Sequence, residues 1–206
     1  CRICYTCVRE CPAKAIRIAN GRAEVISERC IGCGNCIRVC SQKAKKVLDS
    51  KQKVYEMLKA GVKTAVILAP SFPAEFVDID WKRLVGMIRK LGFAYVNEVG
   101  FGADLVAKKY KQLLVQGGPE KSYIATNCPA IIAYVERYHP DLVKNLSPIV
   151  SPMVAAAKVL HKIHGNDLKI VFVGPCIAKK GEIASVNMDS EVTAGLTFVE
   201  LREMFE

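Results

Sequence analysis

Two kinds of hydrophobic pattern alternate along the chain after residue 63. Short apolar runs rich in β-branched residues occur at 64–68, 94–96, 123–125 and 169–173, and stretches with helical spacing occur at 80–91, 104–114, 130–138 and 153–163. Apolar strands that alternate with helices are typical of a parallel sheet covered by helices on its faces. We therefore predict an α/β domain with a parallel sheet over residues 63–206.

The first third of the chain has a different pattern. Residues 15–26 predict two short strands around Asn20-Gly21, a common hairpin dipeptide. Residues 41–62 carry many lysines with a few spaced apolar residues, which indicates a connecting helix or linker. We expect a small α+β domain at 1–48 and a linker helix at 49–62.

Cysteine is the unusual component of the small domain. Of ten cysteines in 206 residues, eight fall in the first forty, in two runs with identical spacing, C-x2-C-x2-C-x3-C. This is the spacing of bacterial two-cluster ferredoxins, in which the fourth cysteine of each run ligates the other run's cluster. We predict a ferredoxin-like domain with two [4Fe–4S] clusters, one held by Cys1, Cys4, Cys7 and Cys40 and the other by Cys30, Cys33, Cys36 and Cys11. Zinc and disulfides are the alternatives, although zinc sites usually pair CxxC units across a longer spacer.

Charge follows the cysteines. Residues 1–60 hold 13 Lys and Arg against 5 Asp and Glu, whereas residues 61–206 hold 17 against 15. The basic side chains would offset the negative charge of two clusters or attract an acidic redox partner such as a ferredoxin, unless they are an ordinary solvated surface. Near balance over 61–206 argues against nucleic-acid binding.

The compartment is inferred from the apolar runs and the cysteines. No run approaches the roughly 18–20 apolar residues that a membrane span needs. Regularly spaced cysteines indicate metal binding in a reducing compartment. We therefore predict a cytoplasmic protein without a membrane span.

Four short segments follow the predicted strands, where ligands of parallel sheets bind. They are Ala69-Pro70-Ser71, Gly100-Phe101-Gly102, Asn127-Cys128-Pro129 and Gly174-Pro175-Cys176. The glycine pair lacks the third glycine of a dinucleotide fingerprint, because position 105 is leucine. Cys128 and Cys176 both adjoin a proline and are expected at the same end of the sheet, which favours a shared metal site over two buried structural thiols.

At these residues the sequence resembles the [FeFe]-hydrogenases, the iron-only hydrogenases. Phe101 to Asp104 resembles the family's FGAD segment, Thr126 to Ala130 its first cluster motif, and Pro175 to Glu182 its PCxxKxxE motif. Ser147 and Ser151-Pro152 lie at family spacing after Cys128. The resemblance covers essentially the whole chain.

The resemblance implies roles for particular residues. Cys128 and Cys176 would supply two of the four thiolates that hold the cubane of an H-cluster, a [4Fe–4S] cluster joined to a di-iron unit. Lys179 would donate a hydrogen bond to a cyanide ligand of that unit, as would Pro70-Ser71 through backbone N–H and hydroxyl. The reaction would be the reversible conversion of two protons and two electrons into H2.

Departures from the family weaken the expectation of fast catalysis. Asn127 stands where catalytic members carry a proton-donating cysteine, and a side-chain amide has no pKa that permits proton transfer near neutral pH. Ser147 lacks relay glutamates on the helix after Asp104, and Gly174 replaces a methionine that packs on the di-iron unit. The family's third motif does not occur before Glu206, so we expect the α/β domain to be C-terminally incomplete.

The sequence therefore supports two alternative functions. The first is a hydrogenase-like protein of an anaerobe that turns over hydrogen slowly or senses it. The second is an electron-transfer or scaffold iron–sulfur protein without a di-iron site.

Overall fold

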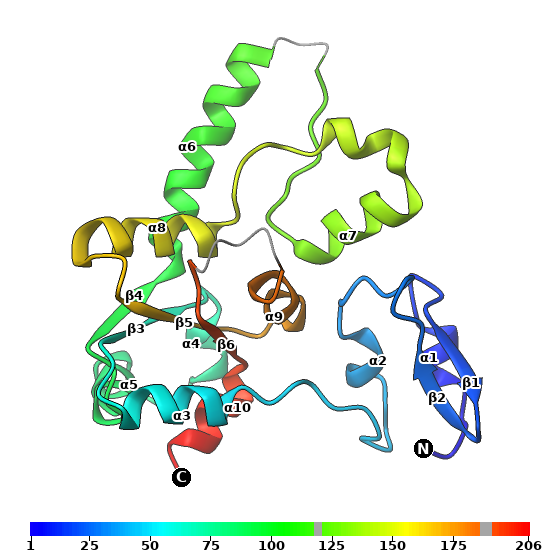
Figure 1. Ribbon diagram of the computed structural model, residues 1–206, viewed down its shortest axis with the longest axis horizontal. Coiled ribbons are helices and arrows are strands. Elements are labelled where there is room, and N and C mark those ends of the chain that lie inside the picture. Colours follow the sequence, from blue (N-terminus) through cyan, green and yellow to red (C-terminus); the bar gives the residue numbers. More distant parts are fainter. Residues whose placement is uncertain (118–120, 186–190) are drawn as a thin grey trace.

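The computed structural model describes residues 1–117, 121–185 and 191–206. A cysteine-rich part with a small hairpin lies at one side of the molecule, and a four-stranded sheet with its helices lies at the other (Figure 1). Residues 39–50 connect the two parts and lead into α3 (Lys51–Lys59). The boundaries 1–48, 49–62 and 63–206 for separate domains stay a prediction.

The cysteine-rich part contains the predicted hairpin. Strands β1 (Ile16–Ala19) and β2 (Arg22–Val25) pair in antiparallel register, with Ile16 opposite Val25. Asn20 and Gly21 have φ values of 49° and 71°, the left-handed pair that a tight two-residue hairpin requires. Helices α1 (Thr6–Arg9) and α2 (Asn35–Arg38) are single turns, one within each cysteine run.

The two cysteine runs fold as structural repeats, 29 positions apart. Left-handed φ values recur at equivalent positions of the two runs: Ile3 and Gly32, Tyr5 and Gly34, and Lys14 and Lys43. Glycine adopts this conformation freely, whereas a β-branched residue such as Ile3, at φ 54°, is strained there. The first run therefore keeps the backbone shape of the second despite an unfavourable residue.

The larger part is built on a parallel sheet, as predicted. Its strands are β3 (Thr64–Leu68), β4 (Tyr95–Glu98), β5 (Lys169–Val173) and β6 (Ala194–Leu196), in the order β4-β3-β5-β6. All residues of β3 are buried, which matches the continuous apolar run in the sequence. The short strand β6 was not predicted.

The prediction of a strand at 123–125 was wrong. Ile124 makes only an isolated bridge to Leu146, away from the sheet. Its N–H donates to the carbonyl of Asn145 at 2.7 Å, and the N–H of Ser147 donates to the Ile124 carbonyl at 2.9 Å. An apolar run of three residues is too short to distinguish a sheet strand from one that pairs with a loop.

Helices cover both faces of the sheet, with α3, α5 and α10 on one side and α6 and α8 on the other (Figure 1). The helices of this part, apart from α3, are α4 (Phe72–Glu75), α5 (Trp81–Lys90), α6 (Val99–Gly117), α7 (Pro129–Tyr138), α8 (Pro152–His164), α9 (Ile177–Ile183) and α10 (Phe198–Met204), with a 3-10 helix η1 (Pro140–Asn145). The segment Gly100-Phe101-Gly102 follows β4 as expected, but it lies inside the first turns of α6, which begins at Val99 and not at the predicted residue 104. Close packing of α6 on α8 explains the glycine at position 102, because a Cβ there would lie 2.2 Å from the carbonyl oxygen of Pro152.

The strand order places one topological switch point at the carboxyl end of the sheet. The chain runs from β3 outward to β4 on one side, and from β5 outward to β6 on the other. Ligands of such sheets bind where the order reverses, here between β3 and β5. Pro70-Ser71 and Pro175-Cys176 follow these two strands, and the Ala69 N–H donates to the Val173 carbonyl at 2.8 Å. Cys128 instead follows a loop outside the sheet, and the carbonyl of the preceding Asn127 accepts a hydrogen bond from Lys179 of α9.

Candidate iron–sulfur site

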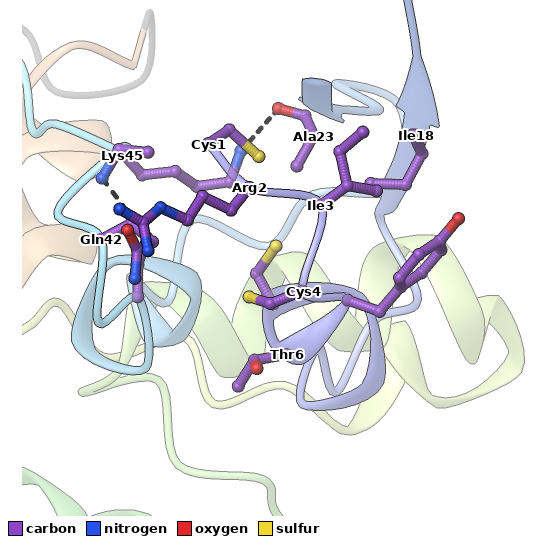
Figure 2. Close-up of a pocket in the computed structure, with 13 residues that line it drawn as sticks. Cys1, Arg2, Ile3, Cys4, Thr6, Ile18, Ala23, Gln42 and Lys45 are labelled. Atoms are coloured by element: carbon purple, nitrogen blue, oxygen red, sulfur yellow. Dashed lines mark hydrogen bonds between the residues drawn. The ribbon is translucent and has the colours of Figure 1, made fainter. Parts of the chain in front are cut away.

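Four cysteines line one cavity of the cysteine-rich part. They are Cys1, Cys4, Cys7 and Cys40. Figure 2 shows Cys1 and Cys4 on its wall, with Ile3, Ile18 and Ala23 nearby. Lys45 also reaches this cavity and donates its ammonium to the Ala23 carbonyl at 3.1 Å. The cavity is narrow, about 30 Å³, so the donor set rather than the free space fits an iron–sulfur cluster here.

A second cavity, of about 380 Å³, gathers the other four cysteines of the repeats. They are Cys11, Cys30, Cys33 and Cys36. Backbone N–H groups point at cysteine sulfurs in these loops: Ala15 to Cys11 at 3.3 Å, Gly32 to Cys30 at 3.4 Å, and Ala44 to Cys40 at 3.3 Å. Such hydrogen bonds stabilise thiolate charge and tune cluster potentials.

The chemistry of these residues fits iron–sulfur clusters. Burial raises the pKa of the Cys36 thiol; Lys45 acts in the opposite direction, and the nearby cysteines Cys30, Cys33 and Cys11 raise it further. A cationic iron core in the cavity would offset this cost. All ten cysteines lie in the described residues as free thiols, so the disulfide alternative has no support. Across residues 1–117, 121–185 and 191–206 no three His, Cys, Asp or Glu side chains converge on a single-ion position.

The second cavity borders the motif that contains Cys176. Ile177, the residue after Cys176, is part of the cavity wall. Gly34 lies against it at φ 76°, and a Cβ there would be 2.6 Å from Cδ1 of Ile177. The loop of Cys33 and Cys36 therefore packs directly on the first turn of α9.

Cys128 and Cys176 occupy matching positions. Each caps the start of a helix, α7 and α9 respectively, in extended backbone conformation. Cys128 is exposed and Cys176 half-buried. Lys179 of α9 is buried and donates to the Asn127 carbonyl at 3.2 Å. This bond joins the two cysteine motifs, which lie more than forty residues apart in the sequence.

The Lys179 ammonium also has an acidic partner. It forms an ion pair with Glu182, with Nζ and Oε2 2.5 Å apart. A buried ammonium needs such a partner, because burial without one carries a large desolvation cost. Lys179 is thus held at the junction of α7 and α9 by groups of this chain.

The remaining predicted site residues lie around this junction or at the same sheet edge. Pro70 and Ser71 are exposed after β3, and Asn127 is exposed before Cys128. Ser147 is buried, and its hydroxyl has no hydrogen-bond partner among the described residues. Thr126 donates its hydroxyl to the Ile149 carbonyl at 2.6 Å, which fixes the start of the Cys128 loop.

Gly174 is tightly enclosed. A Cβ at this position would lie 2.7 Å from Cβ of Ala69 and 2.6 Å from the ring of Phe172. A methionine, which the resemblance implies for other members of the family at this position, would therefore have no room here, because Phe172 and Ala69 fill the adjacent space.

Sequence reasoning missed a buried ion pair beside the site. Lys180 and Glu200 are joined at 2.7 Å, and Lys180 also donates to the Leu48 carbonyl at 2.6 Å. The N–H of Ser50 donates to Glu200 at 2.9 Å. Burial acts to raise the pKa of Glu200, but hydrogen bonds from Lys180, Thr197 and Ser50 outweigh it and lower the pKa. The pair anchors the linker to α9 and α10; a lysine next to Lys179 was the only signal in the sequence.

Two four-cysteine cavities beside a parallel α/β sheet, with two further cysteines at helix starts, define an iron–sulfur protein. Residues 62–206 match the family of the iron only hydrogenase large subunit, C-terminal domain, and residues 1–41 match the 4Fe-4S dicluster domain. The chain belongs to the iron-only hydrogenase family.

Relatives of two kinds are similar to the chain. Iron hydrogenase 1 of Clostridium pasteurianum is 30% identical over 75% of this chain and 31% of its own length. The periplasmic [Fe] hydrogenase large subunit of Nitratidesulfovibrio vulgaris is 28% identical over 77% of this chain and 41% of its own. The cytosolic Fe-S cluster assembly factor NAR1 of Yarrowia lipolytica is 29% identical over 47% of this chain and 21% of its own. The chain thus spans less than half the length of each.

Proposed function

We propose that this chain relays single electrons through two [4Fe–4S] clusters to a third metal site at Cys128 and Cys176. The observation that carries this proposal is the contact of Gly34 with Ile177, which joins the second cysteine cavity to the Cys176 motif. In this arrangement Cys1, Cys4, Cys7 and Cys40 hold the outer cluster, and Cys11, Cys30, Cys33 and Cys36 hold the inner one. A redox partner exchanges electrons with the outer cluster.

The terminal site in this proposal is an H-cluster, which supplies reversible formation of H2 from two protons and two electrons when bound. Cys128 and Cys176 supply two of its thiolates. Lys179 would donate from the junction of α7 and α9, and Ser71, which follows Pro70 at the carboxyl end of β3, would donate through its backbone N–H and its hydroxyl. The side-chain amide of Asn127 does not ionise near neutral pH and would therefore not serve as a proton donor. We therefore expect slow turnover or hydrogen sensing.

The relay is tested by counting iron in matched cysteine variants. Reconstituted protein should bind about eight iron ions in its two repeats, and Cys4→Ser and Cys33→Ser should each remove the electron paramagnetic resonance signal of a different cluster. Cys128→Ser is the control that leaves both signals in place. The two-cluster assignment would be contradicted if Cys4→Ser or Cys33→Ser removed the signals of both clusters. It would also be contradicted if neither variant removed a signal.

Asn127→Cys tests the chemistry at the terminal site. In matured full-length protein the thiol restores a group that can donate and accept a proton near neutral pH. Hydrogen turnover should therefore rise by about tenfold or more. Film electrochemistry of the matched pair measures the rate, with Asn127→Ser as the control of similar size. Equal rates for the unmodified protein and Asn127→Cys would remove this residue from the explanation of slow turnover.

An electron-transfer or scaffold role without a di-iron unit is the second candidate. The enclosed position of Gly174 favours this second role, because Phe172 and Ala69 fill the space that a methionine would occupy beside a di-iron unit in similar hydrogenases. Similarity to the assembly factor NAR1 supports it as well. Infrared spectra of matured protein distinguish the candidates, since bands from carbon monoxide and cyanide ligands arise only with the di-iron unit.

The proposed relay also needs an electron partner, and the charge of the chain indicates its kind. An acidic ferredoxin is the expected electron partner, because the basic excess lies in residues 1–60. Cytoplasmic location stays a prediction, since the names of the relatives include a cytosolic and a periplasmic protein. Within the described ranges, no helix combines the length and apolar character needed to cross a membrane.

A further inference from the structure

The last turn of α7 contacts both loops of the second cysteine set. Tyr138 donates its hydroxyl to the carbonyl of Ala13 at 2.5 Å and lies 3.0 Å from the carbonyl of Arg29. Ala13 follows Cys11 by two residues, and Arg29 precedes Cys30. One phenol therefore bridges the two loops that complete the same cavity.

The ring of Tyr138 adds an apolar contact. It packs against the small core of the cysteine-rich part, which contains Cys7, Cys11, Ala13, Ala15 and Ile16. Its other neighbour is Tyr134 of α7, whose ring stacks on it with centroids 5.2 Å apart. The phenol is thus supported from its own helix while it contacts the other part of the molecule.

Arg137, the neighbouring residue, holds one of these loops a second time. Its guanidinium donates to the carbonyl of Ser27 at 2.9 Å and to the carbonyl of Cys30. The second acceptor belongs to a cysteine of the second set, so a fixed positive charge lies beside that set.

We propose that Arg137 and Tyr138 form a clamp that positions the inner cluster's loops against α7. This inference rests on the proposed relay and adds residues to it. Helix α7 begins at Cys128 and ends at the clamp, so one rigid helix of ten residues, about 15 Å long, connects the terminal site to the inner cluster. Arg137 also raises the reduction potential of the inner cluster, because a positive charge stabilises the reduced, more negative state.

The reduction potential of the inner cluster distinguishes an effect of the Arg137 charge from a purely structural effect. Only a charge effect would be lost in Arg137→Gln and kept in Arg137→Lys. Arg137→Gln removes the charge, so the ratio of reduced to oxidised inner cluster at a fixed potential should fall by about threefold, with the outer cluster unchanged. Arg137→Lys retains a charge and should keep the potential close to that of the unmodified protein. Arg83→Gln, at an exposed position of α5, is the control for charge loss elsewhere. The inner signal in the redox titration is the one lost in Cys33→Ser.

Hydrogen exchange tests the loop contacts independently of any metal. In Tyr138→Phe, amides of residues 11–15 and 26–32 should exchange about tenfold faster, because the bond between the two loops is lost. Tyr134→Phe makes the same chemical change on the same helix, at a hydroxyl without a hydrogen bond in the described structure, and should leave exchange unchanged.

The outcomes separate the clamp from the relay. Equal shifts of both clusters in Arg137→Gln, or equal exchange in the two tyrosine variants, would overturn the clamp. Absence of any cluster at the second cysteine set would instead overturn the relay, and exchange in the metal-free chain would still decide whether Tyr138 ties the loops together.

Discussion

Two helical glycines show how a single residue is judged by what surrounds it. Gly102 in α6 faces the backbone of α8, where a Cβ would lie 2.2 Å from the Pro152 carbonyl and 2.9 Å from the Ala156 nitrogen. Gly86 in α5 has nothing within 4 Å of an added Cβ. The sequence presents both as glycines in helices, and only the packing shows that Gly102 is needed.

Alanine at these positions should therefore have opposite effects. Gly102→Ala forces α6 away from α8 and should lower the free energy of unfolding by about 1–3 kcal/mol. Gly86→Ala should raise it by about 0.5–1 kcal/mol, because alanine favours the helix. Urea unfolding of the two variants measures both, and a neutral Gly102→Ala would show that the helices separate without cost.

At the scale of elements, the Lys180–Glu200 pair connects three segments. Glu200 also closes a capping box at the start of α10, where its carboxylate accepts the Thr197 N–H at 2.6 Å. Ser50 precedes α3, and Lys180 lies in α9. A single carboxylate thus links the linker to both helices, so its charge should control how firmly the linker is held.

Glu200→Gln should lower the free energy of unfolding by about 3 kcal/mol at neutral pH, because Lys180 is left without a buried counter-charge. The matched control is Glu203→Gln in the same helix, whose exposed pair with Lys51 should change stability by less than about 1 kcal/mol. Similar losses in both variants would contradict a special role for the buried pair.

The lowered pKa of Glu200 also predicts a pH dependence. Because the folded pKa lies below the unfolded value, this carboxylate contributes fully above the unfolded pKa and loses its contribution as pH falls through the folded one. Unfolding measured from neutral pH down to about pH 3 should show less acid destabilisation in Glu200→Gln than in the unmodified chain. Parallel pH profiles would exclude Glu200 as a contributor.

At the scale of the whole molecule, charge is distributed unequally between the two parts. Residues 1–60, which contain both cysteine sets, carry an excess of basic side chains, many of them exposed, whereas residues 61–206 are nearly balanced. A field of this kind raises the association rate of an acidic partner and is screened by salt.

Electron transfer from an acidic ferredoxin should therefore slow by about tenfold between roughly 0.02 and 0.5 M ionic strength. Replacing Arg9 and Arg22 with glutamate should weaken both the rate at low salt and its salt dependence. The same change at Lys82 and Arg83 on α5 is the control. If both double variants behave alike, the partner does not approach through the cysteine-rich part.

Much of this protein was determined by local sequence alone. Apolar runs predicted three of the four sheet strands, because strand patterns are properties of short segments. Cysteine spacing predicted two sets of four thiols; each set lines one cavity, and their ligation of clusters stays a prediction. The run at 123–125 was misassigned and β6 was missed, whereas the equally short run at 94–96 was assigned correctly; three-residue segments carry too little pattern to separate these cases.

Only the tertiary structure shows which residues distant in the sequence are in contact. The contact of Lys179 with Asn127, the Lys180–Glu200 pair, the space filled beside Gly174 and the reach of Tyr138 to Ala13 all join residues distant in sequence. Such contacts depend on the strand order and on the direction of α7, which no short segment specifies. The sequence alone identified the cysteines, whereas the contacts between the segments that carry them appear only in the tertiary structure.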